Sequence, residues 1–228
     1  MLREVLSGNF SVLQAVIYII STLFVTFLIL PIHESAHAWT AVKLGDPTPK
    51  YQGRLTLNPF AHIDYLGTLM ILLFGFGWAK PVQINARNFK NPKAGMAVSA
   101  LAGPISNLLV ALLAMLIYNA LYFFVFPHVA STTLVMIVLY FFSFLIQINV
   151  GLAVFNLIPI PPLDGSRILF AFLPDRIYYK VMQYERYIML GVWVLLLTNV
   201  LDRPLNALID LVYNGLFFLA DLPFLPFM

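Results

Sequence analysis

Cysteine is absent from the chain, and charged side chains are scarce. Without cysteine there can be no thiolate metal ligands and no disulfide bonds. Only 10% of the 228 residues are charged and 61% are hydrophobic, which is far from the composition of a soluble domain. The composition indicates a polytopic membrane protein embedded in the lipid bilayer. The polar segments are too short to fold alone, so we expect one domain over residues 1–228. We also expect no cleavable signal peptide, because the apolar run after the N-terminus is too long for one.

The basic residues are unevenly distributed along the chain. Seven of the 13 Lys and Arg residues fall within residues 43–93 and four within residues 167–186. Such clusters bind nucleic acid in some proteins or form a solvated face in others. In so apolar a chain, the rule that positive charge stays on the cytoplasmic side explains them better. We expect both blocks to be cytoplasmic, and we expect no nucleic-acid partner.

The apolar runs predict an all-α polytopic membrane protein with about five to six transmembrane helices. Residues 94–163 contain no Asp, Glu, Lys or Arg, and Pro127 with His128 divides this run into two spans. We expect a core over residues 12–173 and accessory helices over residues 187–220. The predicted spans are about Val12–Lys43, Gly95–Phe126, Thr132–Leu157, Tyr187–Val200 and Leu205–Ala220.

A short membrane-associated element is expected between the first two spans. The run Leu66–Phe76 is apolar, contains glycine and has basic residues on both sides, but it is too short to cross comfortably. We interpret it as a re-entrant or interfacial segment. The alternating residues Arg54–Leu57 predict a short β-strand beside it.

Two histidines and a glutamate lie at membrane depth in the first span. No charged residue separates Val5 from His33, and then His33, Glu34 and His37 occur together. Ionisable groups are costly in lipid, so their presence indicates function rather than simple packing in a helix bundle. Residues i and i+4 share a helix face, so both imidazoles can bind one Zn²⁺ while Glu34 takes a proton from the metal-bound water. Pro31 should kink the helix just before this site.

A catalytic zinc needs three protein ligands and one open position, so a third ligand is required. His62 and His128 lie in loops, and Asp64 is interfacial. Asp164 lies at the inner end of a span, after three prolines that prevent a continued helix. It is therefore the best candidate, and we expect one Zn²⁺ per chain.

Three motifs occur in order along the chain: His33-Glu34-x-x-His37, Ala102-Gly103-Pro104-x-x-Asn107 and Asn156-x-x-Pro159-x-x-Pro162-Leu163-Asp164-Gly165. Together they make the chain resemble the site-2 protease family of intramembrane zinc metalloproteases. The resemblance covers residues 20–175, and residues 53–59 and 79–82 are similar to a compact bacterial branch that lacks PDZ and CBS domains.

The resemblance implies a reaction and a role for each residue. His33, His37 and Asp164 would bind zinc, and Glu34 would act as the general base. Asn156 and Asn107 are candidate donors to the oxyanion, although each could instead make an interhelical contact. The substrate would be a transmembrane protein, cleaved within or near its membrane segment. The expected location is the bacterial cytoplasmic membrane, with the active site nearer the cytoplasmic face because His33 is about 15 Å from Lys43 along the helix.

Some alternatives stay open at this stage. The strand at Arg54–Leu57 and the segment Gly67–Val82 could pair with an extended substrate, or they could form a structural hairpin that shields the site. A transporter would show related motifs in two halves of the chain, and none is present. A metal binder without activity would not need a base at Glu34.

Overall fold

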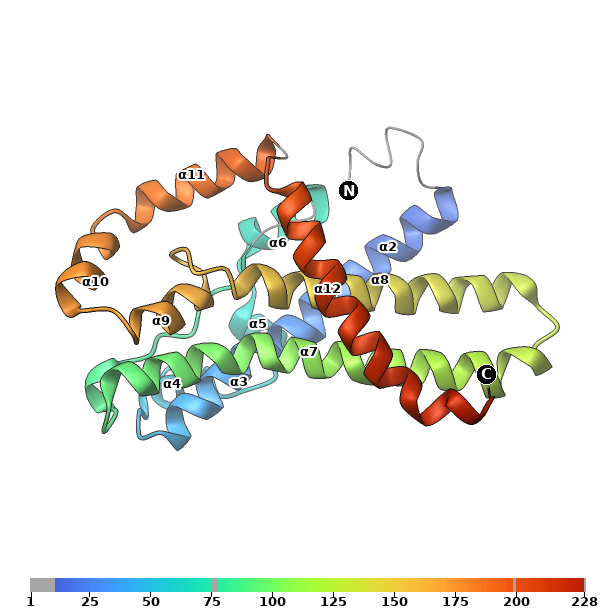
Figure 1. Cartoon of the computed structure of the whole chain (residues 1–228), viewed down its shortest axis with the longest axis horizontal. Coiled ribbons are helices and arrows are strands. Elements are labelled where there is room, and N and C mark those ends of the chain that lie inside the picture. The colour runs from blue at the N-terminus through green and yellow to red at the C-terminus, as the bar shows by residue number, and fades with distance from the viewer. Residues whose placement is uncertain (1–10, 75–77, 199, 228) are drawn as a thin grey trace.

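The computed structural model describes residues 11–74, 78–198 and 200–227, and over these residues the chain is helical (Figure 1). Four helical segments are long and apolar enough to cross a membrane. They are Val12–Lys43, Pro92–His128, Thr132–Asn156 and Asp202–Phe227. The first comprises α2 (Val12–Phe24), a π-helical turn η1 (Val25–Ile29) and α3 (Leu30–Lys43); the second comprises α7 (Pro92–Phe124) and η3 (Phe126–His128); the third is α8 (Thr132–Asn156); the fourth comprises α12 (Asp202–Asp221) and η4 (Leu222–Phe227). The chain is an integral membrane protein.

The predicted number of five to six spans is not confirmed. The predicted span Tyr187–Val200 corresponds to α11 (Glu185–Leu197), and residue 199 lies outside the described residues. A helix of 13 residues is about 20 Å long, less than the roughly 30 Å of the hydrocarbon core. Helix α11 also lies to one side of the pair α7 and α8 in Figure 1. The predicted span Leu205–Ala220 lies within α12.

The strand predicted at Arg54–Leu57 is not present. These residues form bends and irregular chain, and no strand occurs among the residues that the structure describes. The Thr56 carbonyl, which a ladder would use, instead accepts a hydrogen bond from Ser35 Oγ (2.5 Å) and lies 2.8 Å from His62 Nε2. Side chains therefore satisfy this backbone where a partner strand is missing.

The predicted re-entrant run Leu66–Phe76 is largely helical. It corresponds to α6 (Tyr65–Phe74), while residues 75–77 lie outside the described part of the chain. Ten helical residues span only about 15 Å, so α6 is too short to cross the bilayer. Whether the segment enters and leaves by one face stays a prediction.

The first membrane helix contains a π-helical turn immediately before α3. Pro31 cannot donate a backbone hydrogen bond and its ring clashes with the carbonyl four residues earlier. The structure places η1 directly before α3, and Pro31 lies in the first turn of α3. A π turn widens the backbone ladder, which accommodates the proline without ending the helix. The structure has a π turn at this point, and the kink expected at Pro31 stays a prediction.

Helices α7 and α8 form a long antiparallel hairpin that organises the molecule (Figure 1). They pack against the first membrane helix, and α12 crosses both of them. The core between these helices is apolar, with Val25 and Ile29 from η1 meeting side chains of α7 and α8, including Met115 and Val150. The remaining short helices are α4 (Thr48–Tyr51), α5 (Pro59–His62), η2 (Ala86–Asn88), α9 (Asp164–Phe170) and α10 (Asp175–Met182).

Candidate metal centre and active site

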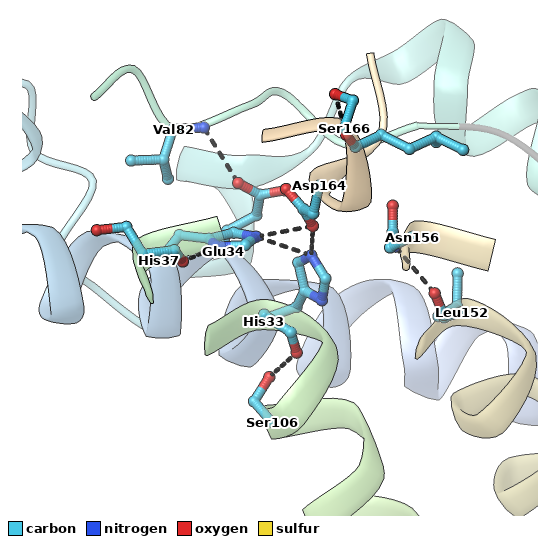
Figure 2. A network of polar contacts seen from close by, with 12 residues as sticks. His33, Glu34, His37, Val82, Ser106, Leu152, Asn156, Asp164 and Ser166 are labelled. Carbon is cyan, nitrogen blue, oxygen red and sulfur yellow. Dashed lines mark hydrogen bonds and ion pairs between the residues drawn. The ribbon is translucent and has the colours of Figure 1, made fainter. Parts of the chain in front are cut away.

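Three side chains from distant parts of the sequence converge at the centre of this arrangement (Figure 2). His33 and His37 lie one turn apart on α3, with their Nε2 atoms 3.0 Å apart. Asp164 Oδ2, from the first turn of α9, lies 3.4 Å from His33 Nε2 and 3.2 Å from His37 Nε2. All three residues are buried, and their donor atoms lie within 4.8 Å of one another.

The donor set fits a zinc ion. Tetrahedral zinc with bonds of about 2.0–2.1 Å places its ligand atoms about 3.3 Å apart. The three separations in this cluster, 3.0, 3.2 and 3.4 Å, bracket that value. Burial alone would raise the pKa of Asp164, but the charges of His37 and His33 lower that pKa. An ionised carboxylate and neutral imidazoles are the forms of these side chains that bind a metal.

The end of α8 and the start of α9 bring Asp164 to the histidines. Helix α8 ends at Asn156, and the proline-containing loop leads to Leu163, whose extended backbone precedes α9. A side chain at Gly165 would overlap the backbone of Leu157 and Ile158, so only glycine allows the chain to turn this closely. Ser166 Oγ donates to the Leu163 carbonyl at 2.7 Å and fixes the turn.

Backbone groups contact the side chains of His37 and Glu34 on α3. His37 Nδ1 lies 2.7 Å from the Ser99 carbonyl of α7, an outer contact of the kind that orients metal-bound imidazoles. Glu34 is buried beside the three ligands, and its Oε2 accepts a hydrogen bond from the Val82 backbone N–H at 3.1 Å. The structure therefore brings Glu34 to the same site as His33 and Asp164.

Comparison with known proteins agrees with this arrangement. Residues 123–198 match the model of Peptidase family M50. YwhC of Bacillus subtilis (strain 168), which is named as a zinc metalloprotease, is 44% identical over 172 residues, covering 75% of each chain.

The chain belongs to peptidase family M50. Rip2 of Mycolicibacterium smegmatis, also named as a zinc metalloprotease, is 31% identical over 179 residues, which is 76% of this chain and 65% of Rip2. No solved structure matches the chain. The protein is a zinc metalloprotease, in agreement with the resemblance to site-2 proteases and with the predicted cofactor Zn²⁺.

The two asparagines predicted to serve this M50 peptidase are placed differently. Asn156 ends α8 near the ligands in Figure 2, half-buried, and its Nδ2 donates to the Leu152 carbonyl of its own helix at 3.0 Å. Asn107 is completely buried on α7, one turn from Gly103, and neither atom of its amide has a hydrogen-bond partner within the described part of the chain. Neither asparagine is hydrogen-bonded to His33, His37 or Asp164.

The other candidate ligands are used elsewhere in the structure. His62 is buried, with Nε2 against the Thr56 carbonyl, and Asp64 Oδ1 accepts the Gly67 N–H at 2.8 Å. His128 is exposed in η3. None of them belongs to the metal-ligand group found among the described residues.

Gly103 has a function in the M50 site that could not be read from its position in the sequence. A Cβ atom at Gly103 would overlap the ring of His37 and would also meet His33. The absence of a side chain lets α7 pack directly against both imidazoles. The motif with Pro104 pointed to this residue, but only the structure shows what occupies the space.

Proposed function

We propose that this protein hydrolyses peptide bonds within or near the transmembrane segments of substrate proteins. The observation that carries the proposal is the placement of His33, Glu34 and His37 on a helix long and apolar enough to cross the membrane. Charged and metal-binding groups are rarely kept at such depth without a function. An M50 peptidase with its active centre inside the membrane can reach bonds that soluble proteases cannot.

Each residue of the site has a proposed role. His33, His37 and Asp164 hold the ion, and Zn²⁺ when bound supplies a Lewis acid that polarises a carbonyl and makes water more acidic. Glu34 accepts the proton of the attacking water and later delivers it to the leaving amine. The Glu34 carboxylate lies next to the ligands, as this role requires (Figure 2).

Asn156 and Asn107 are proposed to assist at the oxyanion. An amide can donate a hydrogen bond to a developing negative charge without bringing a charge of its own. The proximity of Asn156 to Asp164 supports the first assignment, and the unpartnered buried amide of Asn107 supports the second. Substrate would have to reorient Asn156, whose Nδ2 now bonds within its helix.

The proposed location is the cytoplasmic membrane of a bacterium, with the site nearer the cytoplasmic face. The basic blocks 43–93 and 167–186 support this orientation through the positive-inside rule. Along the first membrane helix, His33 and Lys43 are ten positions apart, which is about 15 Å. We propose that residues 12–173 form the catalytic core and residues 187–220 the accessory helices of one domain.

The proposal is tested with purified protein and a peptide that contains a single transmembrane segment. Replacing any one zinc ligand by alanine should sharply lower the bound zinc measured by elemental analysis. Glu34→Gln should keep zinc and lose cleavage, because it preserves shape but removes the base. Asn156→Ala or Asn107→Ala should lower kcat by about 10²–10³-fold without loss of zinc.

Two results would contradict the proposal. One is cleavage by Glu34→Gln at a rate close to that of the unmodified protein. The other is full zinc occupancy in Asp164→Ala, which would remove Asp164 from the ligands. Mass spectrometry of the products shows whether the cut lies in the membrane segment.

A further inference from the structure

An extended segment, residues 78–85, lies against the active site without forming a helix or strand. Backbone hydrogen bonds fix it at three points. The Lys80 N–H donates to the His62 carbonyl (2.7 Å), the Val82 N–H to Glu34 Oε2 (3.1 Å) and the Asn85 N–H to Asp46 Oδ2 (2.7 Å). The Val82 side chain is 3% exposed, so the middle of the segment is packed into the protein.

The sequence of this segment favours one fixed conformation. Pro81 has a restricted φ angle and holds the preceding Lys80 in an extended conformation. Pro81 also has no N–H, so the N–H groups on either side of it, those of Lys80 and Val82, are the ones that bind His62 and Glu34. The donor to Glu34 is thus a backbone N–H in a fixed segment and not a group on a mobile side chain.

We infer that Val82 is a positioning residue whose backbone N–H orients the carboxylate of Glu34. This inference rests on the function proposed above. A glutamate has three side-chain torsions, and Glu34 lies beside the carboxylate of Asp164, which repels it. The N–H binds one oxygen, Oε2, and leaves the other available to accept the proton of the attacking water. Fixing a catalytic group in advance is a large part of enzymatic rate enhancement.

Two other roles for this contact predict different results. If the segment were a latch that occupies Glu34 until substrate arrives, removing the N–H would raise kcat. If the segment only shielded the site from water or lipid, the identity of the group at position 82 would matter less than its bulk. The positioning role predicts a fall in kcat that follows the N–H while KM stays nearly constant, whereas pairing of this segment with an extended substrate would make the loss of the N–H raise KM.

The first experiment compares Val82→Pro with Val82→Ala on the transmembrane peptide. The proline removes the N–H and keeps three side-chain carbons, whereas the alanine keeps the N–H and loses two side-chain carbons, so the alanine tests for loss of bulk alone. We expect kcat of Val82→Pro to be about 10–100-fold below that of Val82→Ala, with KM within about twofold and zinc content unchanged. Gln83→Pro is the matched control for a proline in this segment, since the Gln83 side chain is exposed and bonds to Gln52.

Equal kcat values for the two Val82 variants, or a higher value for the proline, would overturn the inference. If Val82→Pro loses zinc or does not fold, the α-hydroxy analogue of valine at position 82 takes its place. This analogue keeps the side chain and replaces only the N–H by oxygen. The same fall in kcat is expected, and wild-type kcat in this variant would overturn the inference.

The second experiment does not depend on metal or on activity. Hydrogen exchange followed by mass spectrometry should show a slowly exchanging Val82 amide in the unmodified protein. Glu34→Ala should speed exchange at Val82 while the Lys80 amide, bonded to the His62 carbonyl, stays protected. Unchanged exchange at Val82 would show that Glu34 does not hold this N–H.

Failure of the inference can be told apart from failure of the proposed function. If the unmodified protein binds zinc and cleaves the peptide but the Val82 variants do not differ, only the inference fails. If the unmodified protein does not cleave transmembrane peptides, the proposed function fails. In that case the exchange experiment still tests whether Glu34 binds the Val82 N–H.

Discussion

Small residues matter as much as ligands at the scale of single side chains. Gly103 gives α7 its close approach to the imidazoles, and Gly165 gives Asp164 its path to them. Such positions carry no chemistry of their own, yet a methyl group at either would have to displace a ligand or a backbone segment. Protein interiors are packed too densely to absorb that displacement freely.

Gly103→Ala should therefore impair the metal centre. The added methyl group would push His37 and His33 out of position, so we expect lower zinc affinity and an activity about 10–100-fold below the unmodified protein. A competition titration with a chelator measures the affinity. Gly215→Ala on α12 is the control, because a Cβ there meets no atom within 4 Å. Equal zinc affinity in both variants would contradict the packing role of Gly103.

At the scale of elements, the loop after α3 depends on one buried carboxylate. Asp46 accepts hydrogen bonds from Thr48 N–H and Oγ1, from Asn85 N–H and from Asn88 Nδ2. It joins the end of α3 to the segment that precedes α7. Burial alone would raise the pKa of Asp46, but these hydrogen bonds outweigh burial and lower it.

This lowered pKa predicts how stability depends on pH. The ionised Asp46 stabilises the folded state at pH values above the ordinary aspartate pKa of about 3.9, and this stability is lost as the pH falls through the lower folded-state pKa. Asp46→Asn should lower the free energy of unfolding by about 1–3 kcal/mol at pH 7. The free energy of unfolding should also fall less steeply at acid pH in this variant. Thermal unfolding in detergent at pH 7 and below pH 4 measures both. Asp64→Asn should cost less, because the Asp64 side chain accepts a hydrogen bond from the Gly67 N–H and asparagine keeps an oxygen that can accept it.

The elements show where sequence reasoning succeeds. The uncharged run 94–163 with Pro127 inside it predicted the hairpin of α7 and α8 because lipid imposes a simple rule on long spans. The four residues Arg54–Leu57 alternate too briefly to specify a strand when no partner lies beside them. The spacing of His33 and His37 predicted their shared helix face from geometry alone. The contact of Glu34 with Val82 was not predictable, because 48 positions separate them and no local pattern marks a backbone donor.

At the scale of the whole molecule, the distribution of charge gives an orientation that can be tested. The native chain has no cysteine, so single cysteines can be introduced at exposed positions. With cysteine at Lys50, Lys90 or Ala130, an impermeant thiol reagent should label only position 130 in intact cells. Positions 50 and 90 should react after the membrane is opened. Labelling of one of these two from outside would show that the segment containing α6 crosses the bilayer.

The π-helical turn Val25–Ile29 also sets the rotational phase of the first membrane helix. Bonding from i to i+5 accommodates one more residue in that turn than an α-helix does. Since each α-helical residue rotates the chain by about 100°, α3 presents a face offset by about that angle from the one that a continuous α-helix would present. A single deletion within the turn would therefore keep the helix long enough to span but turn His33 and His37 away from Asp164 or turn α2 away from α8. The position of the candidate metal-binding side chains therefore depends on the extra residue of the π turn as well as on the spacing of His33 and His37.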